Sequence, residues 1–303
     1  MKAEMSIPTI TELPPPPSGK TGFPWTAASP IGSASLPDGT VLPRITVVTP
    51  SYNQAAFIEE TLRSVLLQGY PNLEYIVMDG GSTDGSAEII RKYEPWLSYA
   101  RIGPDKGQSD AIAQGFARAT GEILAWLNSD DTYLVGTLAR VGAFFARHRN
   151  IVFAFGDAWN VDATGRMLNR LDTVWSNRFL TANLGVHGWI QPGSFWRRDA
   201  YVRAGGLDPS LHFCMDRDLY LRLLRVGPSA RIAGPPLANF RTHADAKSTV
   251  LTDVGWREHA LLLQRYALAQ HEYLRPWLQL GWWLWIKPAT LRIRLNRAFG
   301  WEL

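Results

Sequence analysis

Residues 45–53 read Ile-Thr-Val-Val-Thr-Pro-Ser-Tyr-Asn, and the architecture of the 303-residue chain follows from them. Residues 45–49 are apolar or β-branched on both faces, which is typical of a buried parallel strand, and Pro50 then ends the run. Residues 56–68 place apolar side chains at helical spacing, and residues 73–78 form a second apolar run. Strand, helix and strand in this order predict one βαβ unit.

The same alternation continues along the chain. It predicts a helix over residues 86–93, a strand over 99–102, a helix over 109–119 and a strand over 123–127. Alternating strands and helices indicate an α/β fold with a doubly wound, mainly parallel sheet. Ligands of such sheets bind beyond the carboxyl ends of the strands, so we expect the site there.

Composition divides the chain into three parts. Residues 1–43 hold nine of the 20 prolines, which predicts an extended or disordered leader, either a plain flexible tail or a partner-binding arm. Residues 44–250 form the predicted catalytic domain. Residues 251–303 are predicted to be a helical, Trp-rich C-terminal segment.

Global composition limits the class of protein. Hydrophobic residues make up 46% and charged residues 19%, as in globular proteins with a sizeable core, and the net charge of +4 by itself selects no partner. The single cysteine, Cys214, excludes an intrachain disulfide and favours a reducing compartment. The N-terminus shows no secretory signal pattern, so we expect a cytoplasmic protein.

Two adjacent acids, Asp130 and Asp131, follow the strand over residues 123–127 in the motif Asn128-Ser-Asp-Asp131. Neighbouring carboxylates repel unless a cation lies between them, and Mg²⁺ or Mn²⁺ is the natural partner when the substrate carries a diphosphate. The alternative is a helix N-cap in front of a helix over residues 132–145.

Asp79 closes a predicted strand and precedes Gly80 and Gly81. A carboxylate there can accept the imide N–H of uracil or thymine, and the alternative is an Asx turn. Tyr52 could stack on the same base, although a tyrosine in a strand-end loop also serves as simple packing.

Further polar residues suit the two sides of a transfer reaction. Lys106, next to Asp110 at a helix start, could offer its charge to phosphate or lie on the solvated surface. Asp216 and Asp218 begin an amphipathic helix, where the helix dipole alone favours acids, and Asp216 is our choice of general base. His243 could bind the metal as a neutral imidazole.

Taken in order, these motifs resemble the family 2 glycosyltransferases with the GT-A fold. The matching segments are residues 49–53, 79–84 and 128–131, followed by 191–196, 205–208, 215–218 and 241–243. The resemblance covers about residues 44–250. It implies an inverting transfer in which Asp216 deprotonates an acceptor hydroxyl, while the metal, Lys106 and His243 stabilise the departing nucleoside diphosphate.

The resemblance also implies a set of site residues. The nucleotide-sugar-binding residues are Thr49, Pro50, Tyr52, Asp79, Lys106, Asp110, Ser129 and Asp130; the acceptor-side residues are Gln191, Trp196 and Asp218; the metal ligands are Asp130, Asp131 and His243. Arg241 or Lys247 would meet the diphosphate.

Three positions depart from the family pattern. Gly80 stands where many members carry a second Asp, which leaves Asp79 as the expected base-recognising acid. Asn128 replaces the first acid of the DxD motif and shifts metal binding to the two acids that follow it. Met215 replaces the acidic neighbour of the general base.

The C-terminal segment bears on the acceptor. Five of the 13 tryptophans lie in its last 27 residues, with basic residues beside them, which suits an interfacial helix over residues 275–303 on an anionic membrane surface. Packing of this segment on the domain is the alternative. A saccharide or polyprenyl-diphosphate-linked saccharide acceptor in cell-surface polysaccharide synthesis would fit the membrane interpretation.

Two other classes of protein compete with the transferase. A nucleotidyltransferase should show a Gly-rich phosphate loop with a basic residue after the first strand, and residues 49–53 have neither. A non-catalytic nucleotide-sugar or polysaccharide-binding protein would bind donor without consuming it. Nucleic acid is not an expected partner, because the basic residues gather with tryptophan at one end of the chain.

Overall fold

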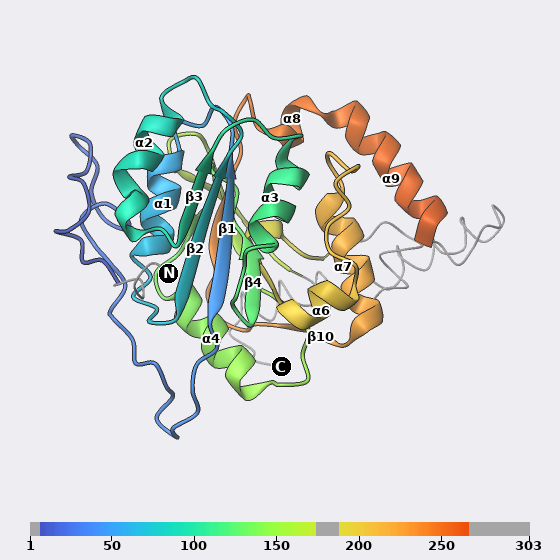
Figure 1. Ribbon diagram of the computed structural model, residues 1–303, viewed down its shortest axis with the longest axis horizontal. Helices are drawn as coiled ribbons and strands as arrows, with labels where there is room; N and C mark the ends of the chain where they lie inside the picture. The colour runs from blue at the N-terminus through green and yellow to red at the C-terminus, as the bar shows by residue number, and fades with distance from the viewer. Residues whose placement is uncertain (1–6, 174–187, 267–303) are drawn as a thin grey trace.

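The computed structural model describes residues 7–173 and 188–266, and its centre is a seven-stranded sheet (Figure 1). The strand order is β10-β6-β9-β4-β1-β2-β3. These strands are β1 (Ile45–Ser51), β2 (Leu73–Asp79), β3 (Tyr99–Ile102), β4 (Ile123–Trp126), β6 (Phe153–Phe155), β9 (Ser194–Arg197) and β10 (Ser229–Arg231). All pairings are parallel except those of β9 with β4 and β6. The predicted mainly parallel sheet is confirmed.

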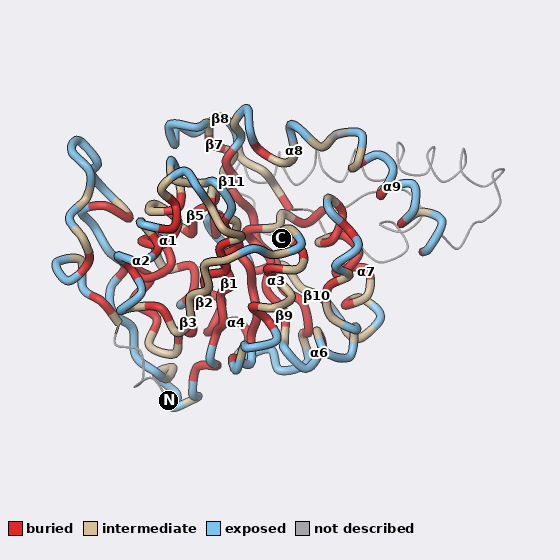
Figure 2. The backbone as a smooth tube through the Cα atoms, turned by 45° about the horizontal axis from the view of Figure 1, so that its top comes forward, coloured by how far each residue is buried: buried red, intermediate tan, exposed pale blue. Residues whose placement is uncertain are grey.

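Helices cover both faces of this sheet. One face packs on α1 (Ile58–Leu66), α2 (Ser86–Tyr93) and α4 (Thr137–Arg147). The other packs on α3 (Gln108–Phe116), α6 (Arg198–Arg203) and α7 (Met215–Val226). Strand β1 is buried along its whole length, and the buried backbone in Figure 2 is concentrated in the sheet between these layers. Burial on both faces explains the continuous apolar runs of the central strands.

A second sheet of four strands flanks the first, in the order β5-β11-β7-β8. Its members are β5 (Thr132–Tyr133), β7 (Ala158–Val161), β8 (Met167–Leu171) and β11 (Ala238–Arg241). The predicted helix over 132–145 is therefore wrong in its first turn, because β5 pairs with β11. The helix α4 begins only after Gly136, whose positive φ of 74° turns the chain.

The Pro-rich leader packs on the domain. Leu13 and Trp25 are buried, and the fully buried Arg63 of α1 donates hydrogen bonds to the carbonyls of Pro14 (2.7 Å), Pro24 (3.0 Å) and Trp25 (2.9 Å). The described leader residues contain turns and the isolated bridge between Ser35 and Val41, but no helix or strand.

After the last strand, the chain forms the short helix α8 (Lys247–Val250) and the longer helix α9 (Thr252–Tyr266). The side chains of Leu262 and Tyr266 join the core next to α7. No helix within residues 7–173 and 188–266 is long and apolar enough to cross a membrane. The proposed interfacial helix over residues 275–303 lies outside the described residues.

Candidate functional site

The loops that follow β1 and β2 are tied together at the carboxyl edge of the sheet. The Asn53 N–H donates to Ser82 Oγ (2.8 Å), the Thr83 N–H donates to Asn53 Oδ1 (3.0 Å), and the Ala55 N–H donates to Asp84 Oδ2 (2.8 Å). Asn53 adopts a positive φ of 52°, which asparagine tolerates better than most residues. The joined loops present the Tyr52 ring with 63% of its surface exposed, as a base-stacking residue requires.

Asp79 makes the Asx turn that was the alternative to base recognition. Its Oδ1 accepts the N–H groups of Gly81 (3.0 Å) and Ser82 (2.8 Å), and its Oδ2 accepts the Ser82 hydroxyl (2.7 Å). The residue exposes none of its surface. This corrects the prediction that Asp79 recognises the base, because its carboxylate holds the loop and does not face the site.

Three other predicted nucleotide-binding residues also lie inside the protein. Thr49 is fully buried, and its hydroxyl pairs with the hydroxyl of Tyr75 (3.0 Å). Pro50 is buried in β1, and Ser129 is 5% exposed. Contact of these three residues with the donor stays a prediction.

Asp130 and His243 come together although 113 residues separate them in the sequence. The His243 Nε2 lies 3.1 Å from Asp130 Oδ2, and the two side chains are 5% and 18% exposed. The Phe57 ring packs against the imidazole with the ring centres 4.7 Å apart. This pair is the part of the predicted metal site that the fold assembles.

Asp131 turns away from this pair. Its Oδ1 accepts the backbone N–H of Arg241 (2.8 Å), and its Oδ2 accepts the Asn128 amide (3.3 Å). Burial, with the Asp130 charge beside it, raises the pKa of the Asp131 carboxyl well above its usual range. In this structure Asp131 joins β11 to the loop after β4, and its role as a metal ligand stays a prediction. The helix N-cap alternative is wrong, because α4 starts six residues further on, at Thr137.

The donor set of Asp130 and His243 fits a metal shared with a substrate. The described residues hold no group of three or more His, Cys, Asp or Glu placed to bind an ion, so the protein alone offers two ligands. Mg²⁺ and Mn²⁺ sites of this kind complete their shell with phosphate oxygens and water. An imidazole nitrogen beside a carboxylate favours Mn²⁺ over the harder Mg²⁺.

Arg241 is committed to the protein. Its guanidinium pairs with Glu60 (3.1 Å), donates to the Asp130 carbonyl (2.7 Å) and lies over the Phe57 ring, and the residue is 3% exposed. This corrects the prediction that Arg241 meets the diphosphate. Its role is to position the backbone of Asp130.

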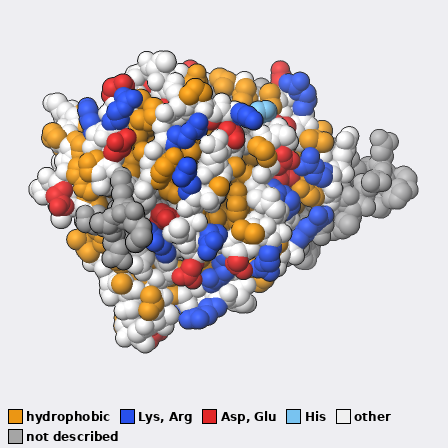
Figure 3. Space-filling view, in the orientation of Figure 1, with side chains coloured by type: hydrophobic (Ala, Val, Ile, Leu, Met, Phe, Trp, Pro, Cys, Tyr) orange, Lys and Arg blue, Asp and Glu red, His pale blue; other side chains and the backbone are white. Residues whose placement is uncertain are grey.

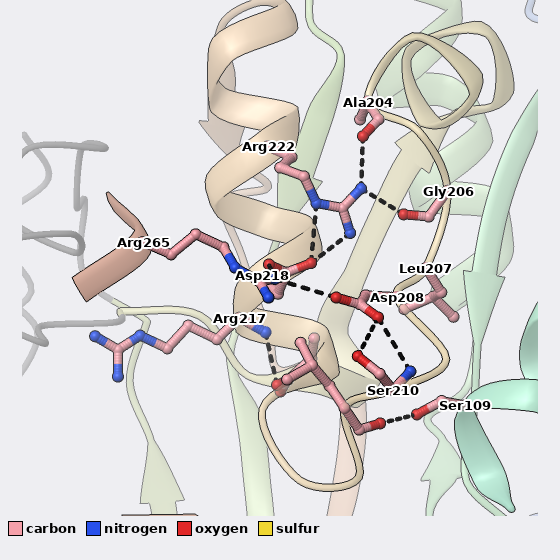
Figure 4. A network of polar contacts seen from close by, with 12 residues as sticks. Ser109, Ala204, Gly206, Leu207, Asp208, Ser210, Arg217, Asp218, Arg222 and Arg265 are labelled. Atoms are coloured by element: carbon pink, nitrogen blue, oxygen red, sulfur yellow. Dashed lines mark hydrogen bonds and ion pairs between the residues drawn. The ribbon is translucent and has the colours of Figure 1, made fainter. Parts of the chain in front are cut away.

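The two acids at the start of helix α7, Asp216 and Asp218, have different surroundings. Asp218 is fully buried and pairs with Arg222 (2.5 Å), as Figure 4 shows. Its other oxygen accepts the Tyr266 hydroxyl (2.6 Å). This corrects the prediction that Asp218 faces the acceptor. Asp216 is partly exposed, and its Oδ1 accepts the Arg217 N–H (2.6 Å). The proposed general base is therefore the acid of this helix start that reaches the surface.

Two acceptor-side predictions have different outcomes. Trp196 is fully buried, with its ring 5.3 Å from that of Trp126, so its predicted contact with acceptor is corrected to a core role. Gln191 is half-buried at the end of β4. Its Oε1 accepts the Asn128 amide (3.1 Å), and its Nε2 donates to the Trp126 carbonyl (2.8 Å). Gln191 thus lies at the edge of the site.

A chain of polar contacts connects α7 to the end of β4. One of its members, Gln108, was not predicted from the sequence. The Lys247 Nζ donates to Gln108 Oε1 (2.5 Å), and the Gln108 amide donates to Asn128 Oδ1 (2.8 Å). The Lys247 ammonium also lies 3.8 Å from the Met215 sulfur, and burial lowers the pKa of Lys247 to about 8. The one available signal was the position of Gln108, directly after Lys106 and Gly107 in a polar turn.

Glu258 of α9 supports the loop that precedes Asp216. Its carboxylate accepts the backbone N–H groups of His212 (2.7 Å), Phe213 (2.8 Å) and Cys214 (2.8 Å). The sequence carried no signal for this role, because Glu258 lies beyond the motifs and inside a helix that reads as amphipathic. The start of α7 is thus fixed from the C-terminal side of the chain.

The turn between β3 and α3 carries Lys106 and Asp110. The Lys106 N–H donates to Asp110 Oδ2 (3.1 Å), which also accepts the Gln114 amide (2.7 Å). The carboxylate of Asp110 therefore braces the turn, and Lys106 is exposed. On the face shown in Figure 3, basic side chains are interspersed with acidic and apolar ones.

Comparison with known proteins places the chain in a family. The model described as Glycosyl transferase family 2 matches residues 46–203. A PGL/p-HBAD biosynthesis glycosyltransferase of Mycobacterium bovis is 35% identical over 185 residues, which cover 59% of this chain and 69% of that protein. TuaG of Bacillus subtilis, named for teichuronic acid biosynthesis, is 34% identical over 116 residues, 37% of this chain and 46% of its own length.

Solved structures share the fold at low sequence identity. TarS 1-349 of S. aureus in complex with UDP-GlcNAc superposes with a TM-score of 0.55 at 18% identity, over 75% of this chain and 68% of that one. The mannosyltransferase PcManGT of Pyrobaculum calidifontis, in complex with GDP-Man and Mn2+, gives 0.54 at 18% identity, over 88% and 83%. At this identity, the likeness concerns the fold.

Proposed function

The chain belongs to glycosyltransferase family 2, and on this premise we propose that it transfers a sugar, with inversion, from a UDP- or dTDP-sugar to an acceptor hydroxyl. The observation that carries the proposal is the Asp130–His243 pair at the end of β4, where nucleotide ligands of parallel sheets bind. The exposed ring of Tyr52 stands at the neighbouring strand end as a platform for the base.

The proposed chemistry assigns a separate task to each side of the site. Asp216 accepts the proton of the acceptor hydroxyl. The oxygen of that hydroxyl bonds to the anomeric carbon, while the bond from the anomeric carbon to the diphosphate breaks. Asp130 and His243 would hold Mn²⁺ or Mg²⁺, which supplies Lewis-acid stabilisation of the charge on the leaving diphosphate. Lys106, exposed on the turn before α3, adds a positive charge that a diphosphate can meet.

The acceptor is proposed from the names of the relatives. The two relatives described above are named for the biosynthesis of teichuronic acid and of PGL/p-HBAD. We therefore propose a saccharide or polyprenyl-diphosphate-linked saccharide acceptor, with residues 275–303 as the contact to an anionic membrane.

A donor panel tests the proposal directly. We expect UDP- or dTDP-sugars to raise the melting temperature in the presence of Mn²⁺ and to release their diphosphate slowly, as measured by differential scanning fluorimetry and a diphosphate-release assay. If donor binds but is never consumed, with or without candidate acceptors, the non-catalytic binding protein becomes the better account.

Replacing Asp130 with alanine should remove the metal dependence. With one of two protein ligands gone, the Mn²⁺-dependent part of donor stabilisation and turnover should fall by about 100-fold or more. The matched control is Asp199→Ala, an exposed acid of α6 that pairs with Arg203. Wild-type activity in EDTA, or an unchanged Mn²⁺ response in Asp130→Ala, would exclude this metal site.

A further inference from the structure

A carboxylate from the loop after β3 occupies the space beside Gly80. A Cβ atom placed on Gly80 would lie 2.9 Å from Asp105 Oδ2 and 3.3 Å from Tyr52 Cδ2. Asp105 and the Tyr52 ring therefore border the same point, the place where a side chain of residue 80 would begin. Tyr52 is 63% exposed and Asp105 is partly exposed, so a ligand can reach both.

Asp105 provides the carboxylate that the end of β2 does not place beside Tyr52. Residue 80 is a glycine without a side chain, and the carboxylate of Asp79 before it is held in its own turn. Residues 79 and 80 therefore bring no carboxylate to the exposed ring of Tyr52. The neighbouring loop supplies one from a position 25 residues further along the chain.

We propose that Asp105 recognises the base of the donor, accepting the N3–H of uracil or thymine through Oδ2 while Tyr52 stacks on the ring. The proposal rests on the function proposed above, because it assumes a nucleoside diphosphate sugar. A carboxylate only accepts hydrogen bonds, so it favours bases with an N–H at this edge and repels cytosine, whose N3 is an acceptor.

The environment of Asp105 selects pyrimidines among such bases. Its Oδ1 accepts the backbone N–H of Gly107 at 2.7 Å, which fixes the carboxylate, while Oδ2 lies beside Gly80, as Tyr52 Cδ2 does. A single free oxygen matches the single imide N–H of uracil or thymine. Guanine presents two adjacent N–H groups and pairs best with both oxygens of a carboxylate.

Asp105→Asn is the sharpest test, because it changes one atom and keeps the turn. The asparagine Oδ1 still accepts the Gly107 N–H, so its amide nitrogen replaces Oδ2 and offers a donor where the wild type offers an acceptor. Isothermal titration of UDP and CDP should show a wild-type preference for UDP of about 10- to 100-fold, which collapses or reverses in the variant. The substitution also removes a negative charge, which changes the affinities for UDP and CDP alike. The ratio of the two affinities is therefore unaffected by the lost charge.

A relocated carboxylate provides the second test. Asp105→Ala alone should lose the UDP preference, and Gly80→Asp with Asp105→Ala should recover it, since the removed side chain leaves room at residue 80. Gly80→Asp alone should not improve binding, because the new Cβ meets Asp105 Oδ2. The control is Glu88→Ala, an exposed acid of α2 that pairs with Arg91.

The outcomes separate this inference from the proposed function. If the wild type binds no nucleoside diphosphate, the proposed function and the inference both fail. If it binds UDP or dTDP and Asp105→Asn leaves the UDP-to-CDP ratio unchanged, the transferase survives and Asp105 is not the base-recognising acid. A wild-type preference for GDP over UDP also overturns the pyrimidine assignment.

Discussion

Asp216→Asn should lower the rate of sugar transfer by about 10²- to 10⁴-fold, the usual contribution of a general base. An amide has the size of the carboxylate but cannot accept the proton of the acceptor hydroxyl. Donor binding should stay close to that of the wild type, because Asp216 lies at the start of α7 and outside the loops that follow β1, β2 and β4. The measurement is kcat for transfer together with the Kd of the donor.

Asp218→Asn provides the contrast from the same turn of the same helix. Asp218 is buried against Arg222 and Tyr266, so its loss should appear first as a lower melting temperature. Transfer by Asp216→Asn at more than a tenth of the wild-type rate, in a variant that melts normally, would remove Asp216 from the mechanism.

Arg63→Met should be the most destabilising single substitution that we describe. The Arg63 guanidinium is fully buried and holds the carbonyls of Pro14, Pro24 and Trp25, and methionine would leave all three without this donor. We expect a loss of about 3–5 kcal/mol in the free energy of unfolding, because three buried carbonyls each lose a hydrogen bond. This should lower the melting temperature by roughly 10 °C.

Removal of residues 1–43 should give a loss of similar size, because it deprives Arg63 of the same three carbonyls and removes the buried contacts of Leu13 and Trp25. Arg91→Met is the matched control, since Arg91 is exposed on α2 and pairs only with the exposed Glu88. If Arg63→Met and the shortened chain both melt within a degree or two of the wild type, the leader contributes nothing to stability.

The leader shows what composition cannot reveal. Its prolines correctly excluded helix and strand, but the contacts that order it depend on Arg63, 38 residues beyond Trp25. In the sequence, Arg63 interrupts the apolar face of a helix between Leu62 and Val65, and such a charge is usually placed at the surface. Only the folded arrangement shows that carbonyl oxygens of an extended segment satisfy it.

The fold itself was largely predictable, because the pattern is local. Continuous apolar runs over residues 45–49 and 73–78 and helical spacing over 56–68 each depend on neighbours a few positions away. The error over residues 132–145 arose where a non-local pairing, that of β5 with β11, took two residues from the expected helix.

The meeting of the three motifs was predictable, but their detail was not. The motifs follow β1, β2 and β4, and parallel pairing brings those strand ends to one edge of the sheet. The direction in which each carboxylate points was not predictable from spacing. Asp79 is satisfied by its own loop, Asp131 by Arg241 110 residues away, and Asp218 by Tyr266 48 residues away.

The hydrogen bonds that join the loops after β1 and β2 also limit which segments can be exchanged between related proteins in a chimera. Asn53 and Ala55 in one loop hold Ser82, Thr83 and Asp84 in the other. A graft of either loop alone would pair a new segment with an unmatched partner and displace the Tyr52 ring. Chimeras meant to change the donor should therefore carry residues 51–55 and 79–86 together, and natural sequence changes in one loop should accompany changes in the other.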